Sequence, residues 1–363
     1  MIPYIILVAA PFLFSVVQFE SQARQLIQKK KNYPILLFFA IYFLLIALRG
    51  ISVGYDTQVY QKIFDNMAWT NWGSLFSPER DEKLFYILNK LVHVCSLDFQ
   101  VLLAIVAFLT VFPLAKLYYE ESDNSMVSIA LFMIIPVFEM NFSGIRQGIA
   151  VSLGVFVFYA VKKRKPIRFL VLTLVAMSFH TSAFILLLMY PLYHARFRSI
   201  HLPLLVPIGV LIYLFNENIY RLILPVLGEE YANQYEQVTE TGAYTMIILF
   251  ILFLAYAFIA PSKELMDETT LGMRNFMILV LFIQLFAPIS TIAMRMNYYY
   301  LIFVPLLIPR ITARWKGVDP FITKVVNIVM IVFFIGYFFF NMNVGTRLGI
   351  YPYTPFWEQV LPQ

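Results

Sequence analysis

The stretch Asn141-Phe-Ser-Gly-Ile-Arg-Gln-Gly-Ile149 places an arginine and a glutamine between two apolar segments, 126–138 and 148–161. A permanently charged guanidinium at such a boundary requires an anionic partner, because burying an uncompensated charge is costly. That partner can be a lipid headgroup, a carboxylate of the same chain or the phosphate of a substrate. The choice depends on how the chain is arranged in a bilayer.

Composition identifies the chain as an integral membrane protein. Of 363 residues, 61% are hydrophobic and 13% are charged, and the mean hydropathy is +0.75. Soluble domains have roughly 45–50% apolar and about 25% charged residues. Uncharged apolar segments recur from residue 2 to residue 340. The expected fold is therefore all-α, a single polytopic transmembrane helix bundle over residues 1–363.

Charge and cysteine usage restrict the class further. The net charge of +6 is explained by basic membrane loops rather than by nucleic-acid binding. A single cysteine, Cys95, excludes an intrachain disulfide. The first apolar segment, 2–19, lacks a basic n-region and an A-x-A-like site, so we expect it to be retained rather than cleaved.

Lysines and arginines predict the orientation of the helices. Short loops rich in these residues stay cytoplasmic, and the clearest are 24–31, 162–168 and 310–316. Segment 169–193 is too long for one crossing and is interrupted by Ser178-Phe-His-Thr-Ser182. We interpret it as a tight hairpin of two helices, which keeps most later basic residues inside. The prediction is about twelve crossings with both termini outside.

Two outer loops are expected between the crossings. Residues 50–98 should form a loop with interfacial helices, and residues 216–243 a long acidic loop that is a candidate lid. Within 84–94 the predicted helix is amphipathic, which favours a re-entrant or interfacial helix over a crossing. Its apolar and polar faces are Leu84, Leu88, Leu91 and Val92, and Lys83, Tyr86, Lys90 and His93, respectively.

The predicted topology brings the polar clusters to the outer side of the membrane. These are 49–56 after the second span, the outer turn 141–147, His180 at the tip of the hairpin, and a second outer turn at 295–300. The chain has no Walker loop, GxGxxG, CxxC or HExxH motif, and no DxD-like pair or His/Asp cluster. Nucleotide hydrolysis, dinucleotide redox chemistry and zinc chemistry therefore lack sequence support. No metal or other cofactor is expected.

Five short motifs, taken in order, resemble the EpsG family of Wzy-like exopolysaccharide and O-antigen polymerases. They are Arg49-x4-Gly54-Tyr-Asp56-x3-Tyr60-x3-Phe64, then Glu82 before Phe85 and Leu88, then Arg146-Gln147-x-x-Ala150, then Phe179-His180-x-Ser182-Ala183, and then Arg295-x3-Tyr299. The resemblance covers most of the chain. Each motif is short, and the specificity comes from their order, spacing and membrane context.

This resemblance implies a multi-pass glycosyltransferase of the bacterial cytoplasmic (inner) membrane with a GT-C-like fold. Such an enzyme joins oligosaccharide repeat units linked to a polyprenyl diphosphate, for example undecaprenyl diphosphate, on the extracytoplasmic side without a metal. The implied partners are the polyprenyl-diphosphate-linked oligosaccharide, membrane lipids, a flippase and a chain-length regulator. Nucleic acid is not among them.

In such a reaction a sugar hydroxyl attacks an anomeric carbon, and the diphosphate leaves with growing negative charge. A guanidinium suits that charge because its planar fork matches phosphate oxygens. The candidate catalytic residues are Arg146 and Arg295 for the diphosphate, His180 as base and Asp56 to orient the acceptor. The candidate substrate-binding residues are Arg49, Tyr60, Glu82, Asn141, Gln147 and Tyr299.

Structural roles compete with these functional ones. Arg49 ends a span and can reach lipid headgroups. Arg146 can pair with Glu139, and Asp56 can cap the helix that follows it. The His180 ring can bond a backbone carbonyl of its own turn.

Other classes of protein and simpler local explanations also compete. A flippase or transporter for lipid-linked sugars is expected to show internal repeats and charges near the bilayer midplane, whereas the ionisable residues here gather at outer helix ends. An O-antigen ligase differs only in its acceptor, and an acyltransferase lacks a His/Asp pair at short spacing. Glu82 can belong to a solvated charge cluster, 79–83.

Overall fold

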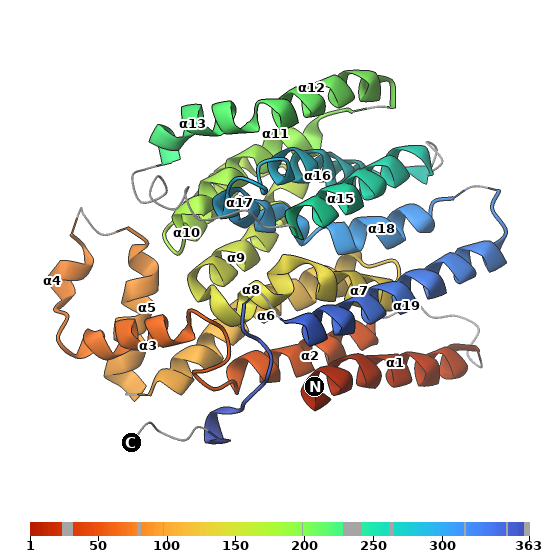
Figure 1. Cartoon of the computed structure of the whole chain (residues 1–363). Helices are drawn as coiled ribbons and strands as arrows, with labels where there is room; N and C mark the ends of the chain where they lie inside the picture. The colour runs from red at the N-terminus through yellow and green to blue at the C-terminus, as the bar shows by residue number, and fades with distance from the viewer. Residues whose placement is uncertain are drawn as a thin grey trace. The chain divides into compact units, whose positions relative to one another are not determined.

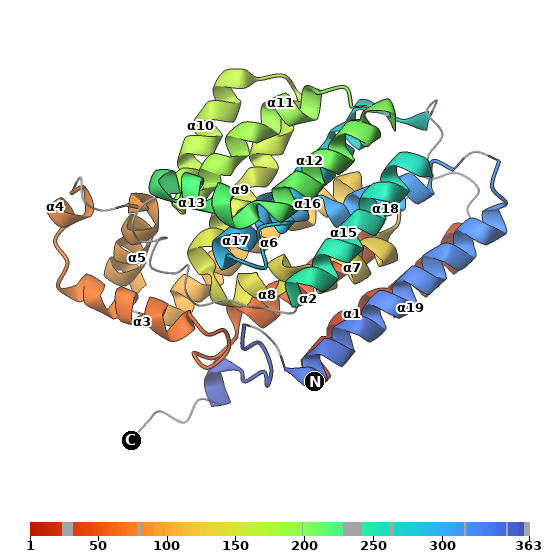
Figure 2. The same ribbon diagram turned by 45° about the horizontal axis from the view of Figure 1, so that its top comes forward.

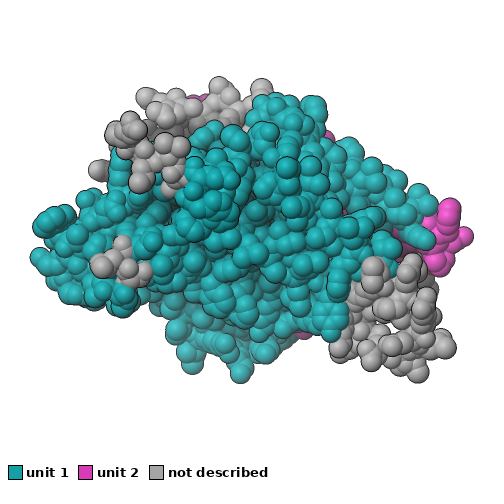
Figure 3. Space-filling model, turned by 90° about the horizontal axis from the view of Figure 1, so that it is seen from below, with its two compact units in different colours: residues 1–184, 324–363 teal, residues 185–323 magenta. Residues whose placement is uncertain are grey.

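The computed structural model describes residues 1–23, 32–77, 81–96, 98–197, 199–227, 242–260, 265–315, 317–345 and 348–358. Within these ranges every regular element is a helix, which confirms the all-α prediction (Figure 1). The described β structure is one isolated bridge between Arg49 and Pro355. The chain divides into two compact units, coloured in Figure 3: residues 1–184 with 324–363, and residues 185–323.

Unit 1 carries the first ten α-helices and most of the last one. They are α1 (Ile2–Ala23), α2 (Tyr33–Ala47), α3 (Thr57–Asp65), the 3₁₀ helix η1 (Asn66–Ala68), α4 (Trp72–Leu75), α5 (Lys83–Ser96), α6 (Phe99–Glu121), α7 (Ser125–Ile134), α8 (Pro136–Ser143), α9 (Ile145–Lys162), α10 (Pro166–Met177), α19 (Pro320–Val344) and η6 (Phe356–Glu358). Helix α9 packs against α6 and α10, and α2 packs against α1 and α6.

Unit 2 is built around α16, which packs against α11, α15, α17 and α18. Its helices are α11 (Met189–His194), η3 (Ser199–His201), α12 (Leu202–Leu214), α13 (Asn216–Leu227), α15 (Gly242–Ile259), α16 (Glu268–Gln284), α17 (Thr291–Leu301) and α18 (Val304–Thr312). The 3₁₀ helix η2 (Thr181–Leu188) connects α10 to α11.

Local sequence explains where several helices begin. Asp98 caps α6 by accepting the Gln100 N–H, and Asn124 caps α7 by accepting the Val127 N–H. Helix α7 ends at Ile134 because Ile135 precedes a proline and adopts an extended conformation, φ −76° and ψ 145°. Helices α7 and α8 are therefore bent by 62° from each other.

The number of described helices that are long enough to cross a membrane is smaller than the number of crossings that the sequence predicts. Among the described residues, helices α6, α9 and α19 are long and apolar enough to cross a bilayer. The number rises from 3 to 5 if the bent pairs α7–α8 and α12–α13 each count as one span. Shorter apolar helical segments include Ile2–Val16, Tyr33–Ala47, Pro166–Met177 and Tyr244–Ile259. The prediction of about twelve crossings is thus not confirmed.

Helix α5 confirms the helix predicted within 84–94, and packing shows which of its residues are buried. The face that packs inward consists of Phe85, Asn89 and Val92, with Lys90 buried beside them, whereas Leu91 is 48% exposed. Phe85 and Val92 join a hydrophobic core with residues of α3, α6 and α9. Of the predicted apolar face, Val92 is buried and Leu88 packs against this core, whereas Leu91 lies outside it, so tertiary packing uses only part of that face.

Three predicted connections can be compared with the structure. The helical segment 169–193 is interrupted at 178–180, as the sequence indicates. Residues 216–243 do not begin as a loop, because 216–227 form α13; the rest of the predicted acidic lid, 228–241, lies outside the described residues. The basic segment 24–31 also lies outside them, whereas 163–165 form the turn between α9 and α10.

The C-terminal segment 348–358, here called the strap, is hydrogen-bonded to the loop that follows α2. Gly50 N–H donates to Thr354 O (2.8 Å) and Gly54 N–H donates to Gly349 O (2.9 Å). The hydroxyls of Ser52 and Thr354 are 2.6 Å apart. The strap therefore fixes the conformation of the loop 49–56 from which α3 begins.

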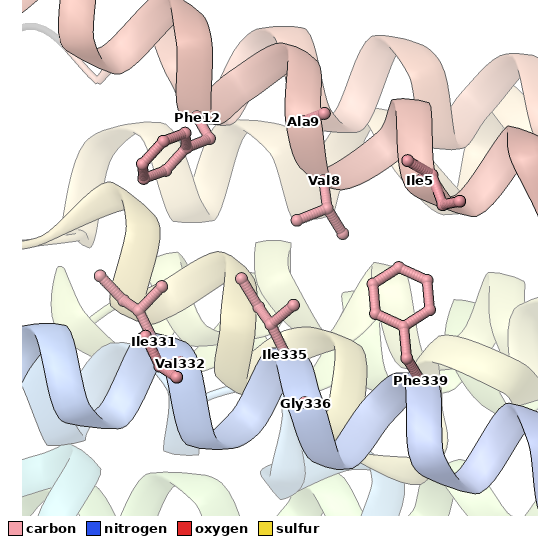
Figure 4. A pocket seen from close by; sticks show the side chains of 9 residues that line it. All are labelled: Ile5, Val8, Ala9, Phe12, Ile331, Val332, Ile335, Gly336 and Phe339. Atoms are coloured by element: carbon pink, nitrogen blue, oxygen red, sulfur yellow. The ribbon is translucent and has the colours of Figure 1, made fainter.

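An apolar pocket of about 480 Å³ lies between α1 and α19 (Figure 4). Its lining residues are Ile5, Val8, Ala9, Phe12, Ile331, Val332, Ile335, Gly336 and Phe339. None of these side chains can donate or accept a hydrogen bond. A polar reaction centre must therefore be sought elsewhere in the chain.

Candidate functional site

A carboxylate in unit 1 joins an arginine and a histidine that are far apart in the sequence. Arg146 Nη1 donates to Glu82 Oε2, and His180 Nδ1 is hydrogen-bonded to Glu82 Oε1. The Thr181 N–H also donates to Glu82 Oε1, at 3.2 Å. The side chains of Glu82, Arg146 and His180 are 8%, 31% and 14% exposed, respectively. The cluster is therefore largely enclosed, with Arg146 at its most accessible edge.

The backbone holds Glu82 in place from both sides. Glu82 has φ 54°, a left-handed conformation that is uncommon for a residue with a side chain. Its carbonyl accepts the Phe85 N–H at 3.0 Å, and the Leu84 N–H donates to Ser178 O at 3.0 Å. This second bond ties the start of α5 to the turn after α10, which carries His180. Backbone strain of this kind is common at functional sites.

Aromatic rings surround the guanidinium of Arg146. Its Cζ lies 5.7 Å from the ring centre of Tyr60 and 5.9 Å from that of Phe85. Both rings belong to the hydrophobic core that packs α3 and α5 on α6 and α9. The buried Arg146 Nε has no hydrogen-bond partner among the described residues. Arg146 thus keeps donor capacity beyond its bond to Glu82.

The neighbours of Glu82 keep it ionised. Burial alone would raise the pKa of Glu82, but the hydrogen bond and charge of His180, the charge of Arg146 and the Thr181 N–H together hold that pKa below its ordinary value. Burial raises the pKa of Tyr60, and the charge and hydrogen bond of Arg146 oppose that rise. The site therefore contains an anion, a cation and a neutral phenol in contact.

Asp56 lies at the edge of this cluster. It occupies the N-cap position of α3, as the sequence allows, but its side chain makes no capping hydrogen bond. Its backbone N–H donates to Ser143 Oγ at 3.1 Å, and its charge contributes to the electrostatics of Tyr60. Asp56 is partly exposed, so its carboxylate is available to another group.

Two other predicted residues lie deeper in unit 1. Arg49 is fully buried, and its Nη1 donates to Ile46 O at 2.5 Å, so the predicted contact with lipid headgroups is wrong. Burial lowers the pKa of Arg49 to about 10. Asn141 is 2% exposed and donates to the Tyr42 hydroxyl at 3.2 Å.

The remaining predicted residues are Gln147, Arg295 and Tyr299. Gln147 follows Arg146 in the first turn of α9 and is buried. Arg295 is exposed and belongs to unit 2, as does the fully buried Tyr299. Both lie inside helix α17, so the prediction that 295–300 form a turn was wrong. The tyrosine run 298–300 is part of this helix. Its composition alone does not distinguish a helix from a turn.

The structure also corrects two structural interpretations. Arg146 pairs with Glu82 instead of Glu139, and His180 bonds a carboxylate rather than a carbonyl of its own turn. Glu82 itself is not part of a solvated cluster. Sequence reasoning missed Phe85 and the Thr181 N–H as contacts of the site, because neither carries a chemical signal of its own.

Chemically, the cluster can orient a base and present a cation to one substrate. A carboxylate on Nδ1 fixes the tautomer of a neutral imidazole, leaving Nε2 as the acceptor. Among the described residues, His180 Nε2 has no hydrogen-bond partner. No group of three or more His, Cys, Asp or Glu residues in the described part of the chain could hold a metal ion.

The fold and this cluster define a helical membrane protein with a preorganised arginine, glutamate and histidine. Residues 32–355 match the EpsG family, and the chain belongs to that family. The EpsG family is a glycosyltransferase-like family of exopolysaccharide polymerases. Comparison with curated proteins and comparison with solved structures find no match.

Proposed function

We propose that the protein joins oligosaccharide repeat units linked to polyprenyl diphosphate, on the extracytoplasmic side of the bacterial cytoplasmic membrane and without a metal. The observation that carries this proposal is the contact of Glu82 with both Arg146 and His180 in a chain of the EpsG family. Arg146 suits a departing diphosphate, and His180 suits an attacking hydroxyl.

The proposed step forms one glycosidic bond and breaks one bond to phosphate. An acceptor hydroxyl oxygen attacks the anomeric carbon of the donor, and its proton passes to His180 Nε2. The bond from the anomeric carbon to the diphosphate oxygen breaks, and the polyprenyl diphosphate leaves with the electron pair. Glu82 stabilises the imidazolium that forms, as a carboxylate does in other histidine bases.

Arg146 is proposed to stabilise the charge that develops on the leaving diphosphate. Fixed cations at such a position commonly supply the largest catalytic contribution. The 31% exposure of the Arg146 side chain leaves part of its guanidinium able to bind phosphate while Nη1 stays on Glu82. Arg295 remains a proposed second cation, and Asp56 a proposed acceptor-orienting residue.

The proposal is tested with purified protein in nanodiscs and a defined polyprenyl-diphosphate-linked repeat unit. Products are separated by size, with EDTA in one arm and Mg²⁺ in another. We expect a ladder in both arms, no ladder from Arg146→Ala, and a normal ladder from Arg168→Ala, whose arginine is exposed at the start of α10. Wild-type chain lengths from Arg146→Ala would refute the role of Arg146.

Two further outcomes would refute the function itself. In sealed proteoliposomes made from the same protein, movement of intact substrate across the membrane without a ladder identifies a flippase. Transfer of one glycan to a different acceptor, again without a ladder, identifies a ligase. His180→Gln with near-normal turnover would remove His180 as the base while leaving the polymerase assignment in place.

A further inference from the structure

Helix α3 leads from the candidate site to the edge of unit 1. Tyr60, near its start, contacts Arg146, and Trp69 follows nine residues later, after η1. A helical rise of 1.5 Å per residue places the two residues roughly 13 Å apart along the axis. Both ribbon views show α4 beyond α3 at one end of unit 1 (Figures 1 and 2).

Two tryptophans are exposed at this end. Trp69 is 90% exposed and Trp72 is 45% exposed. A tryptophan side chain offers a large apolar surface, and leaving it in water is unfavourable unless a ligand covers it. Asp65, Asn66 and Asn71 beside them are also exposed. A charged carboxylate and amides on the same surface fit an aqueous, hydrogen-bonding ligand better than hydrocarbon.

The exposure of the tryptophans is set by a fixed backbone. The buried Lys90 Nζ donates to Met67 O at 2.6 Å, which anchors η1 to α5. Asn71 Oδ1 accepts the Ser74 N–H at 2.9 Å and so caps α4. Rings on a preorganised backbone bind a ligand with less entropic cost than rings on a mobile loop.

We propose that Trp69 and Trp72 bind the pyranose rings of the glycan as it extends from the site along α3. The inference rests on the proposed function, since it assigns a binding surface to the same substrate. Pyranose rings present C–H groups on their faces and hydroxyls at their edges. Indole rings match the faces, and the neighbouring Asn66 and Asn71 can bond the edges.

The test uses binding, so that it does not depend on catalysis. A variant carrying W72F, W315F and W357F keeps Trp69 as the single tryptophan of the four in the chain. The probe is a set of oligosaccharides from partial acid hydrolysis of the exopolysaccharide of the producing cells, with dextran as an unrelated glycan. We expect these oligosaccharides, but not dextran, to change the emission of Trp69 in nanodiscs.

Calorimetry with the same oligosaccharides gives the size of the effect. We expect about threefold to tenfold weaker binding for Trp69→Ala, the size of one aromatic ring contact, and near-complete recovery with Trp69→Phe. The control is Trp357→Ala, because Trp357 is 63% exposed on η6; it should bind as the wild type does. In the ladder assay Trp69→Ala should shorten the chains while the first coupling persists.

Three results would overturn the inference. Wild-type affinity in the double variant Trp69→Ala/Trp72→Ala excludes a glycan surface. Quenching of Trp69 by brominated lipids, with no response to oligosaccharides, places the ring in the bilayer interface instead. A response to an added protein but not to glycan assigns a protein partner. Glycan binding by a wild-type protein that forms no ladder would refute the proposed function but leave this surface intact.

Discussion

Replacement of Glu82 by glutamine isolates the charge of the carboxylate from its shape. Glu82 accepts hydrogen bonds from Arg146 Nη1 and the Thr181 N–H and is bonded to His180 Nδ1. Glutamine has one acceptor oxygen and one NH₂ group, so its NH₂ must face either the guanidinium or the imidazole N–H. Two donors then oppose each other, and one hydrogen bond to a charged group is lost.

The size of the effect follows from that loss. A hydrogen bond to a charged group contributes about 1.5–3 kcal/mol, and the 31% exposure of the Arg146 side chain lets water replace part of it. We expect Glu82→Gln to lower the free energy of unfolding by about 2 kcal/mol. The polymerisation rate should fall at least about 100-fold, because the base loses its orientation and its counter-charge.

The assays are thermal unfolding in detergent and the initial rate of ladder formation. Glu120→Gln is the matched control, since Glu120 also accepts a side-chain hydrogen bond, from Tyr159 at 2.6 Å, but lies outside the site. The control should lose neither rate nor much stability. A Glu82→Gln protein with the wild-type rate would refute the reasoning, and so would an equal loss in both variants.

Three further predictions concern stability. The pKa of Glu82 is held below its ordinary value of 4.5. The stabilisation of the fold by ionised Glu82 should therefore be complete above pH 4.5 and be lost as the pH falls through the lowered pKa. Thermal unfolding between about pH 7 and about pH 3 should show this loss for the wild type and not for Glu82→Gln. Gly54→Ala should cost about 2–3 kcal/mol, because at φ +86° its Cβ would lie 2.2 Å from a backbone oxygen. Gly317→Ala, at φ +74° in open space, should cost only about 1 kcal/mol by the same denaturation assay. Lys90→Met should cost about 1–3 kcal/mol by leaving a buried carbonyl unbonded, whereas Lys62→Met, at an exposed position, should cost little.

The helical class and several breaks in the chain could be predicted from the sequence. Composition requires helices, and the polar residues at 178–182 interrupt an apolar segment where α10 ends. The buried face of α5 could not be predicted, because Phe85 and Val92 are selected by core residues more distant in sequence. The number of crossings could not be predicted either, since apolarity alone does not show where Pro136 divides a span into α7 and α8.

The sequence predicted which residues belong to the candidate site but not which of them contact each other. Tyr60, Arg146 and His180 each carry a recognisable chemistry, and the structure brings them together in unit 1. The central position of Glu82 was not predictable, since its partners lie 64 and 98 residues away. Its neighbours in the sequence are charged and resemble an ordinary solvated surface. Only the tertiary structure separates Glu82 from them.

The strap has a consequence for how the protein is made in the cell. Ser52 and Thr354, whose hydroxyls meet, are separated by 302 positions. The early helices therefore leave the ribosome long before the segment that pins their connecting loop has been translated. Contacts of such long range form late. The loop that leads into α3 and Tyr60 should accordingly reach its final conformation only after the strap has been translated.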